Sequence, residues 1–121
     1  MKKYIEIKDR QAPMVDCFFA FSNSQLAKGI EEKGLQGKKI YKGMYGLYGT
    51  KDGIRNFLKF YEDMEKEIAQ KCKPQDVYDY EFDNHECGYV GDDEEAINIV
   101  ISYFGMDAVK DVKRKYAWKY V

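Results

Sequence analysis

The amino-acid sequence predicts a single α+β domain over residues 1–121, in which a mostly antiparallel sheet packs in two layers against three to four helices. Two observations carry this prediction. The chain has 121 residues, of which 45% are hydrophobic, which suffices for one core and is short for two. Segments with the two-residue period of strands alternate with segments that have the helical period, and short turns connect them.

The first third of the chain predicts two strands and a capped helix. Residues 3–8 (KYIEIK) alternate apolar and charged side chains, which is typical of a strand with one solvent-exposed face. Residues 14–21 (MVDCFFAF) are rich in aromatic and β-favouring side chains and predict a central strand. The S-x-x-Q pattern that begins at Ser22 is a capping box, so we expect a helix over 23–33 that stops at Gly34.

The middle of the chain predicts a glycine-rich hairpin followed by a long helix. Residues 39–48 (KIYKGMYGLY) place glycines between aromatic residues, which favours two short strands around a turn or a bulged hairpin. Thr50 is expected to cap a helix over 51–73, because apolar side chains recur there at three- and four-residue steps. Pro74 lies just beyond the end of that helix.

Residues 77–90 predict a second hairpin. Residues 77–82 (VYDYEF) alternate apolar and acidic side chains and are expected to form a strand. A return strand at 87–90 is expected to pair with it across a turn at Asp83 and Asn84.

Two helices are predicted for the last part of the chain. Asp92 or Asp93 caps the first, and apolar side chains at helical spacing continue to its end at Gly105. Asp107 is expected to begin the final helix. The side chains expected on its buried face are Val109, Val112 and Tyr116.

Composition and cysteine usage predict a soluble cytoplasmic protein. The three cysteines cannot all pair within one chain and their spacing fits no zinc pattern, so reduced thiols are the simplest interpretation. Charges interrupt every apolar run in residues 1–15, and no stretch approaches 18 apolar residues. We therefore expect no signal peptide, membrane span, metal or cofactor. The cysteines are Cys17, Cys72 and Cys87.

Charge is nearly balanced in sum and uneven along the chain. The net charge of −1 argues against a strongly basic nucleic-acid binder. Residues 76–107 nevertheless hold ten acidic residues and no lysine or arginine, whereas residues 110–119 hold five basic residues and one acidic residue. The simplest interpretation of the basic end is a solvated helix face. Nucleic-acid binding through it, with Tyr116 and Trp118 stacking on bases, is the alternative.

Residues 80–96 (YEFDNHECGYVGDDEEA) concentrate reactive groups and hold the only histidine of the chain. On a strand, Asp83, His85 and Cys87 would point to the same face. A catalytic site is one interpretation, with His85 activating the Cys87 thiolate and Asp83 orienting His85. In the other interpretation, Asn84 and His85 satisfy backbone groups at a turn while Cys87 packs as a small hydrophobic residue.

Four carboxylates follow at 92–95. They are most simply explained as cap and dipole partners of a helix, since no calcium-loop spacing is present. They are also candidate binding residues on an acidic surface. The four are Asp92, Asp93, Glu94 and Glu95.

Residues 42–51 (KGMYGLYGTK) invite comparison with a phosphate-binding loop. The order departs from that motif, because Thr50 precedes Lys51. A surface that grips a peptide or a base remains open, with Tyr41, Tyr45 and Tyr48 as contacts. Alternatively, the tyrosines fill the face of the sheet and the glycines let the chain bend.

Three segments together resemble a family of small uncharacterised proteins from bacteria, their phages and mobile elements. They are CFFAFSNSQ (17–25), GLYGTKDGI (46–54) and YEFDNHECGYVGDDEEAINIV (80–100). The resemblance extends from about Cys17 to Tyr116. It implies no activity, only a genomic setting in which small accessory proteins, including modulators of host or defence proteins, are common.

Three functional hypotheses follow. The leading one is a non-enzymatic accessory protein that contacts a protein partner through an acidic, aromatic surface around residues 78–95. The second is a small enzyme that uses His85 and Cys87, with Asp83 orienting. The third is nucleic-acid binding through residues 110–119, which the charge balance does not favour. The sequence does not indicate the partner or the oligomeric state.

Overall fold

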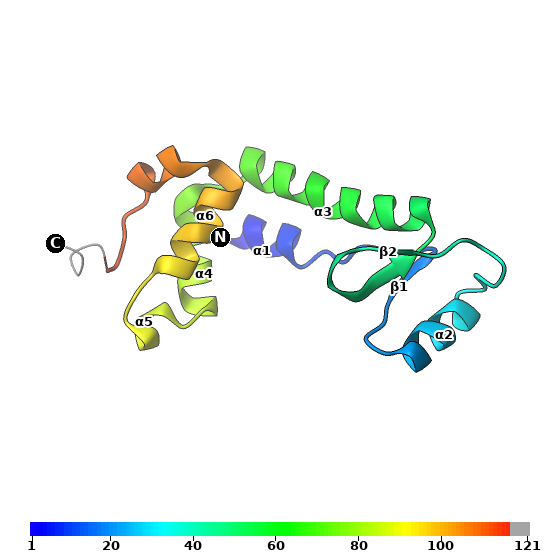
Figure 1. Ribbon diagram of the computed structural model, residues 1–121. Helices are drawn as coiled ribbons and strands as arrows, with labels where there is room; N and C mark the ends of the chain where they lie inside the picture. Colours follow the sequence, from blue (N-terminus) through cyan, green and yellow to red (C-terminus); the bar gives the residue numbers. More distant parts are fainter. Residues whose placement is uncertain (117–121) are drawn as a thin grey trace. The chain divides into compact units, whose positions relative to one another are not determined.

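The computed structural model describes residues 1–116, and the chain divides into two compact units (Figure 1). Unit 1 comprises residues 1–10 and the chain from Met64 onward, and unit 2 comprises residues 11–63. Each unit has a hydrophobic core of its own. The prediction of one domain over residues 1–121 stays a prediction.

The regular elements of unit 1 are all helices among its described residues. Its core gathers buried side chains from five helices, with Tyr4, Tyr78 and Val100 among them. The elements are α1 (Lys2–Lys8), the second part of α3 (Lys51–Lys71), α4 (Pro74–Asn84), α5 (Cys87–Val90), α6 (Glu94–Phe104) and the 3-10 helix η2 (Met106–Asp111).

Unit 2 is built around a three-stranded antiparallel sheet with the order β1-β3-β2. Successive strand residues point to opposite faces, and Phe18 lies against α2 while Phe19 packs edge-to-face on Phe57 of α3. Helices therefore cover both faces of this sheet. The elements are β1 (Cys17–Phe19), α2 (Asn23–Glu32), β2 (Tyr41–Lys42), the 3-10 turn η1 (Met44–Gly46), β3 (Leu47–Gly49) and the first part of α3.

The predicted α+β class fits a largely helical structure with a small antiparallel sheet, and the predicted two-layer packing is not confirmed. The prediction that residues 14–21 form a central strand is right about the strand and wrong about its position. β3 is central, since it pairs with both β1 and β2.

Three predicted strands are helices instead. Residues 3–8 form α1, whose buried side chains Tyr4 and Ile7 are one helical turn apart. Residues 77–82 lie within α4, where Pro74 occupies a first-turn position that suits its missing N–H. Residues 87–90 form the one-turn helix α5. Alternation over six residues misled the prediction, because Tyr78, Tyr80 and Phe82 are two apart in the sequence although the fully buried side chains of α4 follow helical spacing.

The local start and stop signals are confirmed. The Ser22 Oγ accepts a hydrogen bond from the Gln25 N–H at 3.2 Å, and the Gln25 side chain accepts one from the Phe21 N–H at 2.7 Å. Gly34 ends the segment with φ 65°. The Thr50 Oγ1 caps α3 by accepting from the Gly53 N–H at 3.0 Å. The hairpin predicted for residues 39–48 is formed by β2 and β3.

The final helix predicted from Asp107 is wrong beyond residue 111. The 3-10 helix η2 ends there, and Val112 has extended backbone with φ −104° and ψ 125°. Val112 is nonetheless buried and Tyr116 half-buried, so a segment without helical structure packs on the core where a helix was expected. Trp118 and Lys119 lie outside the described residues.

Two further findings concern the apolar character of the helices and the state of the cysteines. Across residues 1–116, none of the helices combines the length and the apolar character that crossing a membrane requires. Cys17, Cys72 and Cys87 are free thiols.

Candidate functional site

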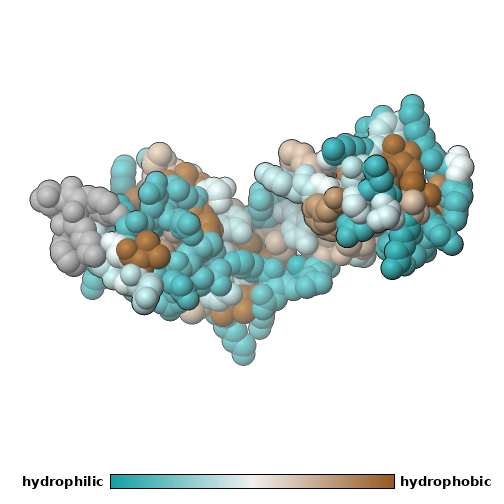
Figure 2. Space-filling view, turned by 60° about the horizontal axis from the view of Figure 1, so that its bottom comes forward, coloured by the Kyte–Doolittle hydropathy of each residue, from teal (hydrophilic) through white to brown (hydrophobic). Residues whose placement is uncertain are grey.

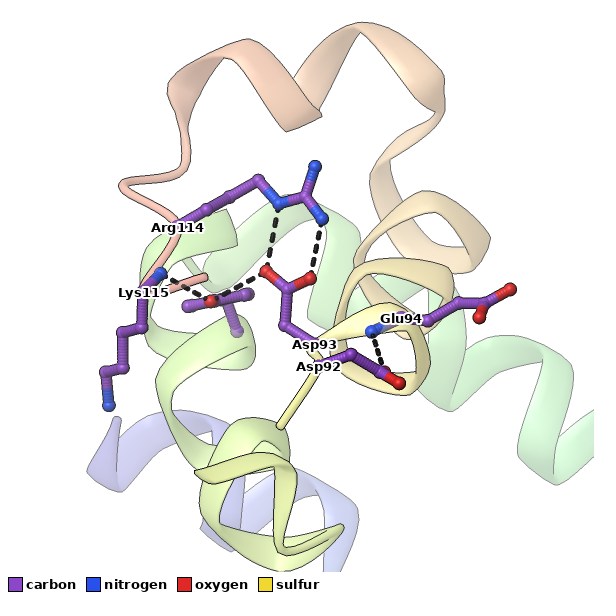
Figure 3. A network of polar contacts seen from close by, with 6 residues as sticks. Asp92, Asp93, Glu94, Arg114 and Lys115 are labelled. Carbon is purple, nitrogen blue, oxygen red and sulfur yellow. Dashed lines mark hydrogen bonds and ion pairs between the residues drawn. The ribbon is translucent and has the colours of Figure 1, made fainter. Parts of the chain in front are cut away.

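A fully buried carboxylate, Asp93, organises one end of unit 1 (Figure 3). The guanidinium of Arg114 donates to both of its oxygens, from Nε at 2.9 Å and from Nη2 at 2.6 Å. The Tyr78 hydroxyl also donates to it at 2.9 Å, and accepts in turn from the Lys115 N–H at 2.8 Å. Bidentate arginine–carboxylate pairs are strong and directional. Asp93 therefore fastens residues 114–115 to α4 and α6.

Burial and hydrogen bonding shift the ionisation of this group. The hydrogen bonds from Arg114 hold the pKa of Asp93 below its usual range, although burial opposes this. Burial raises the pKa of Tyr78 to about 12. Asp93 is thus ionised and Tyr78 neutral near pH 7, which matches the hydrogen bonds that each one makes.

The neighbouring carboxylates have separate roles. The Asp92 Oδ1 accepts from the Glu94 N–H at 3.1 Å, so Asp92 and not Asp93 caps α6 with its side chain. Glu94 and Glu95 are exposed at the start of α6. Of the four predicted binding residues, Asp93 faces the interior, and the other three keep solvent access.

His85 lies between two carboxylates at the end of α4. Its Nδ1 is 2.7 Å from Glu95 Oε2, and its Nε2 is 3.5 Å from Glu81 Oε2. Glu81 is buried and also pairs with the ammonium of Lys8, which sits 4.8 Å from the centre of the Tyr80 ring. Both ring nitrogens of His85 therefore face carboxylates of α4 and α6.

The structure brings His85 and Cys87 to one hollow of about 160 Å³. Cys87 is 3% exposed, and burial raises the pKa of its thiol, which lowers the thiolate fraction near neutral pH. Asp83 does not line this hollow, and the carboxylates nearest to His85 are those of Glu81 and Glu95. The catalytic role of His85, Cys87 and Asp83 stays a prediction. Among residues 1–116, no group of three or more His, Cys, Asp or Glu side chains is placed to hold a metal ion.

The one-turn helix α5 projects two large side chains that sequence reasoning missed. Tyr89 is 93% exposed and Val90 is 66% exposed, whereas Cys87 in the same turn is buried in the core. Left-handed residues bound the turn, Glu86 with φ 52° and Gly91 with φ 90°. The sequence signal was Gly-Tyr-Val-Gly, a tyrosine and a valine between two glycines.

Two hollows flank α5, and acidic side chains line both. A hollow of about 530 Å³ lies beside Tyr89 and is bordered by Asp83 and Glu86. The 160 Å³ hollow lies beside Val90 and is bordered by Asp92, Glu94 and Glu95. We call the following seven residues the α5 face: Asp83, Glu86, Tyr89, Val90, Asp92, Glu94 and Glu95.

In unit 2 the three predicted tyrosine contacts do not form one surface. Tyr45 is 86% exposed at the hairpin turn. Tyr48 is half-buried, with its ring stacked on Phe18 at 6.3 Å between centroids. Tyr41 precedes Lys42, which pairs with Tyr48, so Tyr41 and Tyr48 point to opposite faces of the sheet.

Comparison with known proteins gives a family and no activity. A family model described as a family of unknown function, DUF7659, matches residues 3–119. No curated protein matches the chain, and no solved structure does.

Proposed function

The chain belongs to the family of unknown function DUF7659, and we propose that within it this protein is a binding module that contacts a protein partner through the α5 face of unit 1. The observation that carries the proposal is the exposure of Tyr89 and Val90 on a turn whose other side is anchored in the core. Exposed aromatic side chains of this kind supply the central contacts of many interfaces.

The attachment of α5 supports a preformed contact surface. Cys87 packs in the core, and the Tyr116 hydroxyl donates to the Gly88 carbonyl at 3.0 Å. The Tyr116 ring stacks on Phe82 with 5.5 Å between centroids. A side chain presented on a fixed backbone loses less conformational entropy on binding, which favours affinity.

The charge around the two apolar side chains indicates the chemistry of the partner. Asp83 and Glu86 border one side of α5, and Glu94 and Glu95 border the other. Residues 76–107 contain no lysine or arginine, and a nearby cation is Lys115, whose ammonium lies 4.3 Å from the centre of the Phe82 ring. An acidic rim steers association toward a basic surface and disfavours acidic ones. The expected partner is a protein with an apolar pocket inside a basic rim.

The experiment compares matched variants of the full chain as bait in an extract of the source cell, followed by affinity measurements on the purified partner. We expect Tyr89→Ala to weaken binding by roughly 30-fold, which corresponds to about 2 kcal/mol for a central aromatic contact. Met106→Ala is the control, because Met106 is also exposed in unit 1 and lies outside the α5 face. Recovery of the same proteins in equal amounts by both variants would refute the proposal.

A second arm tests the charge. Replacing Glu86 and Glu94 by lysine is expected to slow association and to weaken its dependence on salt. Asp93 is left unchanged in this arm, since its carboxylate is part of the buried network. An affinity that does not respond to charge reversal would rule out the acidic rim as the recognition element.

A further inference from the structure

We infer that unit 2 binds single-stranded nucleic acid through a second surface at the β2–β3 hairpin, which we call the hairpin face: Phe21, Lys42, Tyr45 and Tyr48. Phe21, Lys42 and Tyr48 line a hollow of about 330 Å³ on the α2 side of the sheet. Tyr45 occupies the adjoining turn. The right-hand part of Figure 2, which is unit 2, shows hydrophobic side chains at the surface among hydrophilic ones.

Two rings of the hairpin face are held out in solvent by the local backbone. Phe21 is 77% exposed, and its ring lies so close to Gly46 that a Cβ there would come within 2.6 Å of it. The Ala20 N–H donates to the Gly46 carbonyl at 2.9 Å and fixes this approach. Tyr45 has φ 56°, a left-handed conformation that an aromatic residue rarely adopts. Such strain, on a side chain that is 86% exposed, is typical of a binding position.

The charge around the hairpin is the reverse of that around α5. Residues 33–51 contain five lysines and no acidic residue. Lys38, Lys39 and Lys42 are exposed, and the ammonium of Lys39 lies 5.4 Å from the centre of the Tyr41 ring. Lysines and tyrosines are thus interspersed between Lys38 and Tyr48, with Lys42 and Tyr48 on the same face of the sheet.

Stacking separates single strands from other polyanions. Each base offers a π-face to an exposed ring, and aromatic rings interleaved with lysines form the usual platform for unpaired nucleotides. Tyr48 and Phe21 line the same hollow, where an unpaired base has a ring to stack on. An acidic peptide would use the lysines and leave the rings without partners.

Fluorescence anisotropy of the full chain with labelled oligothymidylate and oligouridylate tests the inference. We expect binding that weakens with added salt, with a log–log slope of at least about 0.7, the value for a single phosphate contact by Lys42. Lys42→Glu and Phe21→Ala are expected to weaken it at least tenfold. Lys59→Glu on α3, at a side chain that is 71% exposed and outside the hairpin face, is the control.

Tyr45→Gly separates recognition from folding. Glycine favours the left-handed φ at this position, so the variant removes the ring and relieves the backbone strain at once. We expect weaker oligonucleotide binding from a protein that is no less stable than the wild type.

Three outcomes would overturn the inference. They are no binding at low salt, equal binding of duplex and single strand, and binding of polyglutamate as tight as that of the oligonucleotides with no response to Phe21→Ala. Tyr89→Ala is expected to leave oligonucleotide binding unchanged, so the test is independent of the partner proposed for the α5 face.

Discussion

The α5 face of unit 1 and the hairpin face of unit 2 share a construction and differ in charge. Each presents an exposed tyrosine, Tyr89 or Tyr45, beside a hollow. Each also depends on a non-glycine residue in left-handed backbone, Glu86 with φ 52° and Tyr45 with φ 56°. Carboxylates line the hollows of one surface, and Lys42 lines the hollow of the other. Under the two proposals, the same local construction serves different partners because the charge beside it is reversed.

The two surfaces are attached to their units by different means. α5 joins a large core that the buried Asp93–Arg114 pair closes. The hairpin belongs to a small core formed by Phe18, Ala20 and Leu35. There, the backbone of β1 approaches β3 so closely that only glycine fits at Gly49. The stability of unit 1 should therefore depend most on its buried ion pair. The stability of unit 2 should depend most on the absence of a side chain where its strands approach each other.

The largest effect is expected from Arg114→Ala. This variant leaves the Asp93 carboxylate buried without its cation, which typically costs about 3–5 kcal/mol of unfolding free energy. Arg10→Ala is the matched control, because Arg10 pairs with Glu67 at the surface of the same unit and exposed pairs contribute about 0–1 kcal/mol. Urea denaturation measures both. Equal losses would mean that the buried pair does not close the core.

Gly49→Ala is expected to have the next largest effect, in unit 2. A Cβ at this position would lie 2.7 Å from the Cα of Cys17 and would overlap the Asp16 carbonyl, which the backbone must move to relieve. Overpacking of this kind typically costs about 1–3 kcal/mol. At Gly43 the nearest atom to a new Cβ is 3.4 Å away, so Gly43→Ala should cost less in the same urea experiment. If Gly43→Ala is the more damaging, close approach is not what limits unit 2.

Lowering the pH should reduce the unfolding free energy of unit 1 because Asp93 becomes protonated. The reduction should be smaller than the one caused by Arg114→Ala. The folded pKa of Asp93 lies below its unfolded value, so its contribution is complete above the unfolded pKa of about 3.9 and is lost as pH falls through the folded pKa. The stability gap between wild type and Asp93→Asn should be constant near neutral pH and narrow below about pH 4. A gap that widens on acidification would contradict the assigned ionisation.

The contrast between the units also separates what the sequence could predict from what it could not. The caps at Ser22 and Thr50 were predictable, because a cap depends on residues within one turn of the helix. The buried Glu81 was not, since its cation Lys8 is 73 residues away in sequence. The alternating apolar residues of 77–82 therefore suggested a strand. The segment is part of the helix α4, and its acidic residue Glu81 is buried in a pair with Lys8.

The candidate sites divide in the same way. His85 and Cys87 were predicted to share a face, and they do meet at one hollow, but through the end of α4 and the start of α5 and not along a strand. Asp93 seemed a surface residue because its role depends on Arg114, 21 residues later. Tyr89 was overlooked, since exposure is a property of the fold and not of local pattern.

The smallest expected effect is a gain in unfolding free energy, whereas the variants above are expected to lose it. This difference in sign makes it the most informative test of the construction that the two turns share. Tyr45→Gly and Glu86→Gly each relieve a left-handed conformation, worth about 1–2 kcal/mol, against an entropic cost of about 0.5–1 kcal/mol for glycine in the unfolded chain. We expect each variant to be about 0.5 kcal/mol more stable than wild type in urea, while Gly37→Ala, at φ 80° with open space around it, should be less stable. Suppose that both glycine variants are more stable than wild type and only Tyr45→Gly loses oligonucleotide binding. Each left-handed residue then costs stability, and the chain keeps it because of the side chain exposed at that turn. If neither is stabilised, other contacts fix these turns, and the left-handed residues do not mark the two surfaces as related.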